Sequence, residues 1–156
     1  MTYDMQEALT RFDLILMSIN KTISELLQET GLEYTISREQ MEALIIIRTC
    51  HQVTVNELAE KQGIFKTAAS KRINKLEKLG LVRRVESENK RIKLMHLTEE
   101  GTRFFEEVKR KLSSVVEESL NGLFSIEEIN DFVNKLEDIE KALKNRKRYI
   151  HDYIHD

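Results

Sequence analysis

The absence of proline constrains the fold of this chain more than any other feature of its sequence. No proline and only five glycines occur among the 156 residues. Proline is the strongest helix breaker, so its absence favours long helices whose ends are set by glycines and capping residues. A chain of this length can bury one core but cannot form the two independent lobes of a large multidomain catalyst.

Periodicity and capping residues predict six helices. Apolar side chains recur at three- and four-residue steps over residues 5–29, which predicts an amphipathic helix that ends before Gly31. Ser37, Thr54 and Ser125 are each followed three residues later by Gln or Glu, the capping box that begins a helix. The remaining predicted helices cover about 37–49, 55–62, 66–79, 98–121 and 125–147. The second of the six contains the apolar run Leu44–Ile47, which has no polar side, so we expect it to be central and buried.

The hydrophobic period changes after Gly80. Residues 81–87 and 91–97 alternate apolar and polar side chains, the pattern of two half-buried strands, and they are joined through residues 88–90. The fold class predicted is therefore mainly α with a small β-wing of two to three strands.

Charge is divided unevenly along the chain. The whole chain has a net charge of −2, but residues 60–95 contain eleven Lys or Arg against four Glu, a net charge of +7. The remainder has 14 basic and 23 acidic residues, a net charge of −9. A basic segment inside an acidic frame is typical of a module that binds a polyanion, and the alternative is a solvated lysine-rich helix face.

A short helix, a glycine turn, a longer helix with a polar outer face and a basic hairpin form a winged helix-turn-helix when they follow in this order. In that motif the second helix enters the major groove of DNA, and an arginine at the wing tip can enter the minor groove. The predicted DNA-binding residues are Lys66, Thr67, Ser70, Lys71, Asn74, Lys75 and Lys78 on the helix, and Asn89, Lys90 and Arg91 in the wing. Ser70, Lys71 and Asn74 are the expected base readers. Only one of Arg83 and Arg84 can face a given side of the strand, so we expect at most one of them to contact phosphate.

Several segments carry a family resemblance. They are Leu58-Ala59, Gly63-Ile64, LEKLGLV at 76–82 and above all NKRIKLMHLTEEG at 89–101. Residues 89–101 are similar to a wing signature with Asp-x-Arg followed by Leu-x-x-Leu-Thr. On these residues the chain, most clearly from 37 to 101, resembles the MarR family of bacterial transcriptional regulators.

The resemblance implies a homodimer that binds pseudo-palindromic operators, most often as a repressor, and that is often released by a small molecule or an oxidant. It implies dimerisation helices in residues 1–36 and 99–156 around a DNA-binding domain at 37–98. A pocket for a small-molecule effector is expected between the outer helices and the winged domain, although the sequence singles out no residues for it. The alternative is a winged-helix module that binds protein and never DNA, and the +7 segment argues against it.

The sequence departs from the family pattern at two positions. The aspartate of the wing signature is Asn89, which can hydrogen-bond a neighbouring arginine but cannot orient it by charge. Phe65 precedes the fourth helix where a Ser or Thr cap is usual, so the helix either begins one turn differently or leaves an amide for phosphate or water.

Cysteine and histidine residues give weaker signals. Cys50 is the only cysteine and lies at the end of an apolar helix, where we expect a small buried hydrophobe and not an oxidant sensor. His151 and His155, like Asp152 and Asp156, are four residues apart, so a helical tail would align them at metal-ligand spacing. Terminal residues usually fray and no third ligand is evident, so we predict no metal site there. The other two histidines, His51 and His96, are expected at the surface or at an interface.

No motif of catalysis is present. The sequence has no nucleophile elbow, phosphate-cradling glycine loop or paired metal-ligand motif, so we expect a protein that is not an enzyme and needs no cofactor. Its longest apolar run, residues 43–47, is far shorter than the roughly 20 residues of a membrane helix. With a lone cysteine and an acidic N-terminal segment, we expect a reduced, cytoplasmic protein without a membrane partner.

Overall fold

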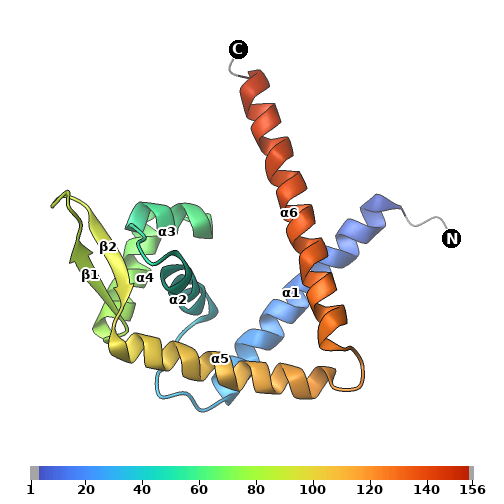
Figure 1. Ribbon diagram of the computed structural model, residues 1–156, viewed down its shortest axis with the longest axis horizontal. Helices are drawn as coiled ribbons and strands as arrows, with labels where there is room; N and C mark the ends of the chain where they lie inside the picture. Colours follow the sequence, from blue (N-terminus) through green and yellow to red (C-terminus); the bar gives the residue numbers. More distant parts are fainter. Residues whose placement is uncertain (1–3, 155–156) are drawn as a thin grey trace. The chain divides into compact units, whose positions relative to one another are not determined.

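Eight elements make up the fold of the computed structural model, which describes the backbone of residues 4–154 and the side-chain exposure of residues 4–148. They are α1 (Met5–Glu29), α2 (Arg38–Cys50), α3 (Val55–Gln62), α4 (Lys66–Lys78), β1 (Val82–Glu86), β2 (Lys93–Leu97), α5 (Glu99–Leu120) and α6 (Ile126–Ile154) (Figure 1). The chain divides into two compact units, with the boundary between Ser113 and Ser114 in α5. The predicted fold class, mainly α with a small hairpin, is confirmed.

Capping residues set the helix starts as the sequence predicted. In α2, the Gln40 amide donates to Ser37 Oγ at 3.1 Å and the Ser37 amide donates to Gln40 Oε1 at 2.8 Å. Thr54 with Glu57 and Ser125 with Glu128 form the same reciprocal pair. These bonds satisfy amides that the first turn of a helix leaves without a partner, so each helix begins at a defined residue.

The winged core surrounds α2. Met41, Ala43, Leu44 and Ile47 of α2 are buried, and they belong to one core cluster with side chains of α3, α4, α5 and both strands. Ile45 is 45% exposed, so the prediction that the whole apolar run is buried is wrong at this residue. Successive residues of a helix are about 100° apart, and the face that α2 turns to the core ends before Ile45.

The β-wing has two strands and one additional bridge. β1 and β2 pair antiparallel, in a register from Val82 opposite Leu97 to Glu86 opposite Lys93. On the other edge of β2, Val53 forms an isolated bridge with Met95, whose amide donates to the Val53 carbonyl at 2.7 Å. The wing is thereby attached to the segment between α2 and α3 as well as to α4.

The base of the wing is closed by the first turn of α5. Thr98 Oγ1 donates to the Gly80 carbonyl at 2.5 Å and accepts from the Gly101 amide at 2.9 Å. Gly101 is buried, and a Cβ built on it would lie 1.9 Å from the Leu81 carbonyl oxygen. The helix can pack this closely on the turn before β1 only because residue 101 has no side chain.

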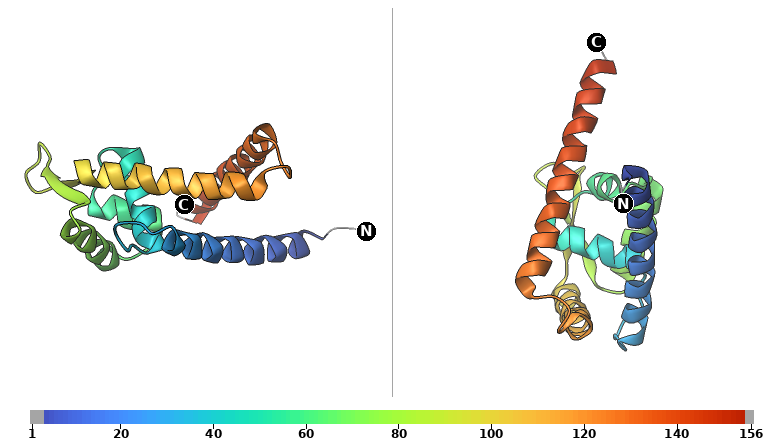
Figure 2. Two further views of the ribbon diagram at one scale, coloured as in Figure 1. Left: turned by 90° about the horizontal axis from the view of Figure 1, so that it is seen from below. Right: turned by 90° about the vertical axis from the view of Figure 1, so that its right-hand side faces the viewer.

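Helix α1 leaves most of its length exposed. Leu27 is its one buried residue, whereas Leu9, Phe12, Leu16 and Ile19 are between 43% and 56% exposed. The N-terminal half of α1 extends away from the elements of the winged core in Figure 1 and in the left view of Figure 2. An exposed apolar stripe of this length is typical of an association surface.

The second unit, from Ser114 onward, exposes an apolar stripe of its own. On α6, Phe132, Ile139 and Leu143 are 60%, 55% and 67% exposed, and Ile129 and Leu136 on the same face are half-buried.

In the described part of the chain, no helix has the combination of length and apolar character that crossing a membrane requires.

Candidate DNA-binding surface

Helix α4 has the two-faced character that the sequence predicted. Ala69, Ile73 and Leu76 are buried, and they fix the inner face of the helix against the core. Of the seven residues predicted on its outer side, Ser70 is half-buried. The other six are exposed: Lys66, Thr67, Lys71, Asn74, Lys75 and Lys78. Among the described residues, no ion pair involves any of the four lysines on this face. Their charges are therefore available to phosphate groups.

A polar clamp, formed by Arg84, Asn74 and Glu77, joins the wing to α4. Arg84 Nη2 donates to Asn74 Oδ1 at 2.6 Å, and Arg84 Nε lies 3.2 Å from Glu77 Oε1. Arg84 therefore supports α4, whereas Arg83, the preceding residue on the strand, takes part in no ion pair of the described residues. This clamp could not be predicted from sequence patterns, because its partners lie seven and ten residues apart across a turn.

The clamp limits what Asn74 can offer to a base. Its amide oxygen already accepts from Arg84, while its NH₂ group keeps two donors. A bidentate contact with adenine needs both the oxygen and the NH₂ group, so it would compete with Arg84. Donation to an acceptor such as guanine O6 or N7, or thymine O4, would leave the clamp intact.

The wing tip is held by backbone and short side-chain bonds. Asn89 Oδ1 accepts from the backbone amide of Arg91 at 3.2 Å, and the Asn89 carbonyl accepts from Ser87 Oγ at 2.7 Å and from the Ile92 amide at 2.8 Å. The side chain of Asn89 can hydrogen-bond a neighbouring arginine, and in the structure its bond is to the main-chain amide of Arg91. Lys90 and Arg91 are exposed and take part in no ion pair of the described residues.

A second ion pair stiffens the hairpin below the tip. Lys93 Nζ lies 2.7 Å from Glu86 Oε1 on the opposite strand. This hydrogen bond, followed by the charge of Lys93, holds the pKa of Glu86 below its ordinary value. Lys93 is thereby neutralised by its neighbour, whereas Lys90 and Arg91 at the tip take part in no ion pair of the described residues.

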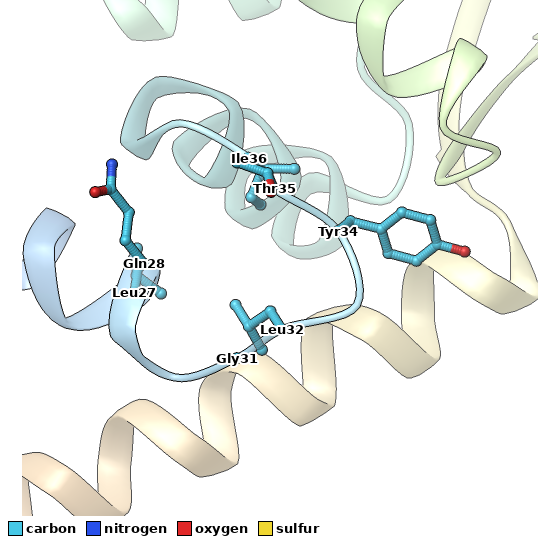
Figure 3. A pocket seen from close by; sticks show the side chains of 7 residues that line it. All are labelled: Leu27, Gln28, Gly31, Leu32, Tyr34, Thr35 and Ile36. Carbon is cyan, nitrogen blue, oxygen red and sulfur yellow. The ribbon is translucent and has the colours of Figure 1, made fainter.

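A cavity of about 260 Å³ lies at the end of α1 and in the loop before α2, within the first unit. Its lining residues are Leu27, Gln28, Gly31, Leu32, Tyr34, Thr35 and Ile36 (Figure 3). The sequence did not identify this set, because loop residues of mixed polarity form no motif.

Tyr34 connects this cavity to α5. Its hydroxyl donates to Glu100 Oε1 at 2.9 Å, and its ring meets the Phe104 ring edge to face at 5.2 Å between centroids. Arg103 bonds both Glu100 and Glu33. The bond from Arg103, and then that from Tyr34, lowers the pKa of Glu100, and the bond to Glu100 raises the pKa of Tyr34.

Cys50, His51 and His96 are not part of α4. Cys50 is free and half-buried, and His51 after it ends α2 with a φ of 59°. His51 and His96 line a cavity of about 140 Å³ with Arg48 and Thr102. The described residues contain no group of three or more His, Cys, Asp or Glu that could hold a metal. The side chains of His151, Asp152, His155 and Asp156 lie outside the described residues.

Comparison with known proteins agrees with this geometry. The sequence model of the MarR family matches residues 34–91, from the loop before α2 to the wing tip. The HTH-type transcriptional regulator TcaR of Staphylococcus aureus is 27% identical over 148 residues, which is 92% of this chain and 96% of that protein. The uncharacterized HTH-type transcriptional regulator YfiV of Bacillus subtilis is 30% identical over 114 residues, 72% of this chain and 71% of that protein.

A solved structure extends the likeness to three dimensions. FabT of Streptococcus pneumoniae, solved in complex with DNA, superposes with a TM-score of 0.68 at 25% identity, and the match covers 88% of this chain and 98% of that one. The family match includes α2, α3, α4 and β1. The chain belongs to the MarR family of transcriptional regulators.

Proposed function

We propose that this protein is a homodimeric, sequence-specific DNA-binding regulator that recognises a pseudo-palindromic operator and acts as a repressor. The observation that carries the proposal is the outer face of α4, whose exposed lysines have no ion-pair partners among the described residues. A structure of similar fold, FabT, was solved in complex with DNA. As a regulator of genes the protein would act in the cytoplasm, where a bacterial chromosome lies, and without enzymatic activity.

The residues of α4 divide by role. Ser70, Lys71 and Asn74 lie in the middle of its outer face, so they would meet base edges when the helix enters the major groove. Lys75 and Lys78, nearer the C-terminal end, and Lys66 with Thr67 at the start would contact phosphates and fix the register. Base contacts then give sequence discrimination, and phosphate contacts give affinity for any DNA.

The wing would occupy the adjacent minor groove. Asn89 holds the backbone of the tip, which presents Lys90 and Arg91 to solvent without a competing carboxylate in ion-pair contact. The minor groove is narrow and strongly negative over A·T-rich steps, and arginine senses this width more than base identity.

Two apolar stripes support dimerisation. α1 exposes Leu9, Phe12, Leu16 and Ile19, and α6 separately exposes Phe132, Ile139 and Leu143. Covering such stripes with a second copy of the chain removes apolar surface from water, and a two-fold dimer presents two α4 helices to two half-sites. In this assignment residues 37–98 bind DNA, and 1–36 and 99–156 dimerise.

The 260 Å³ cavity is the proposed effector site. Its volume is slightly below the range of about 300 to 1,000 Å³ for small-molecule pockets, which suits a small effector, and it is lined by apolar side chains with a few polar groups. Tyr34 links its wall to α5 through Glu100, so a ligand in the cavity would act on the contact between the α1–α2 loop and α5.

Selection from a random pool of duplex DNA tests the proposal. Enrichment of one sequence with two inverted half-sites is expected, with footprints one helical turn or a multiple of it apart. Recovery of no sequence would instead favour a winged-helix module that binds protein, because a shift of arbitrary DNA at low salt shows only charge attraction.

Affinity for the selected operator is expected to fall steeply with salt. Each phosphate contact releases counterions, which gives a slope of about −0.9 per contact in a plot of log affinity against log salt. Two winged domains with the charge described above predict a slope between about −4 and −10. Titration by fluorescence anisotropy at four or five salt concentrations measures it, and a flat dependence would remove phosphate contact as the source of affinity.

Arg91→Ala is expected to weaken operator binding by about 1 to 3 kcal/mol and leave thermal stability unchanged, since a dimer loses two exposed cations from the minor groove. The matched control is DNA in which the A·T pairs under the wing become G·C. On that wider groove the loss should shrink, and an equal loss on both duplexes would show that Arg91 contacts only phosphate.

A further inference from the structure

Phe65 is the most exposed large apolar side chain of the described residues. It is 87% exposed and lies between the end of α3 and the start of α4. At this exposure it takes almost no part in the core, so burial on folding does not account for a phenylalanine at this position.

Phe65 is also unsuited to its place in the helix. It is the N-cap residue of α4, with φ −69° and ψ 150°, and no side chain accepts a hydrogen bond from the first turn. Helices α2 and α3 and the capping pair before α6 use Ser37, Thr54 and Ser125 at the same position. Serine or threonine would satisfy an amide that phenylalanine leaves open, so both burial and capping disfavour Phe65.

The backbone that carries Phe65 is nevertheless firmly held. The amide of Ile64 donates to the Ala59 carbonyl at 3.0 Å, and the Phe65 carbonyl accepts from the Ala69 amide at 3.1 Å. Gly63 supplies the left-handed residue of the turn, with φ 64°. A residue that the fold disfavours at a well-ordered position is expected to serve a binding function.

The surroundings of Phe65 indicate what it binds. Lys61, Lys66 and Lys71 are exposed near it in sequence on α3 and α4, and none of them takes part in an ion pair of the described residues. Phe65 stands at the N-terminal end of α4, the end of a recognition helix that contacts base edges. An apolar ring within a cationic surface suits a place in the major groove that is itself apolar.

We propose that Phe65 is a specificity-determining residue that packs against the C5 methyl group of a thymine in the major groove. This inference rests on the proposed function. The thymine methyl is the one apolar group among the base edges of that groove, and a phenylalanine ring can neither donate to nor accept from the polar edges of the other bases. Each half-site should therefore contain a thymine opposite the start of α4, twice in a dimeric complex.

Uracil substitution isolates this contact, because uracil differs from thymine only by lacking the methyl group. In the selected operator, each thymine is replaced in turn by uracil. For the full-length wild-type protein, one position per half-site should weaken binding about fourfold, and both together about fifteenfold, the value of one buried methyl group per site. For Phe65→Ser the same substitutions should have no effect.

A matched variant and a stability measurement separate this role from others. Lys75→Ala should bind more weakly yet keep the full uracil effect, since it removes a charge and no apolar contact. Phe65→Ser should raise the melting temperature by about 2 to 4 °C, because it adds a cap and removes almost no buried surface. A lower melting temperature would assign Phe65 to the fold instead.

The outcomes distinguish this inference from the proposed function. If an operator is selected and uracil weakens wild type and Phe65→Ser equally, or weakens neither, the thymine contact is refuted and DNA recognition stands. If no operator is selected, both are refuted.

Discussion

Replacing Gly101 by alanine is expected to destabilise the winged unit by about 3 kcal/mol or more and to abolish operator binding with it. A Cβ at residue 101 would lie 1.9 Å from the carbonyl oxygen of Leu81 and 2.8 Å from its carbonyl carbon. That oxygen also accepts from the Thr98 amide at 3.0 Å, and Leu81 is fully buried. Neither the turn at Leu81 nor the start of α5 can move aside without breaking the hydrogen bonds of Thr98 that close the base of the wing.

The sign of this effect is opposite to helix propensity, which makes the test discriminating. Alanine favours a helix interior over glycine by about 1 kcal/mol, so an exposed glycine at this point of α5 would gain stability on substitution. Urea unfolding followed by circular dichroism measures the change. Ser114→Ala, at an exposed position of the same helix, is the control and should stay within about 0.5 kcal/mol of wild type. A Gly101→Ala protein as stable as wild type would show that the close approach of α5 to Leu81 is absent in solution.

Placing glutamate at both Phe132 and Ile139 is expected to separate the proposed dimer and to weaken operator binding by about two to four orders of magnitude. Both side chains are more than half exposed on α6, at 60% and 55%, so the substitution should leave the fold of one chain intact. Four unpaired carboxylates cannot be buried across a two-fold interface. Without the dimer the two half-sites are bound independently, and the gain from joining two binding events is lost.

A matched control is available on the opposite side of the same helix. Asn130 and Asn134 are exposed and lie about 180° around α6 from the apolar stripe, so glutamate at both adds the same charge outside the proposed interface. Light scattering after size exclusion should give a monomer for the first variant and a dimer for the control. A first variant that remains dimeric with wild-type affinity would remove α6 from the interface.

The sequence predicted most of the fold because its signals are local. The capping boxes at Ser37, Thr54 and Ser125 fix helix starts through bonds between residues three apart, so the predicted starts agree with the structure to within a residue or two. The alternation after Gly80 depends only on which strand face is buried, and it identified both strands. Such patterns are visible without knowledge of the tertiary structure.

What the sequence did not show depends on contacts between distant residues. The clamp of Arg84 on Asn74 requires the strand register relative to α4, and the exposure of Ile45 requires the packing angle of α2. The bond from Tyr34 to Glu100 joins residues 66 positions apart. In the sequence, Phe65 is recognisable only as an unusual N-cap residue, because its exposure depends on the packing of α3 and α4.

The clamp between Arg84 and α4 sets the spacing between the recognition helix and the wing in each winged unit. One guanidinium on the wing, that of Arg84, is bonded to Asn74 at 2.6 Å and to Glu77 at 3.2 Å, and both of these residues are on the recognition helix. The protein then determines how many base pairs separate the major-groove contact from the minor-groove contact, and bound DNA has to bend or twist to match that spacing. In the proposed dimer, an effector would therefore change the distance between the two winged units and leave the spacing between helix and wing within each unit unchanged.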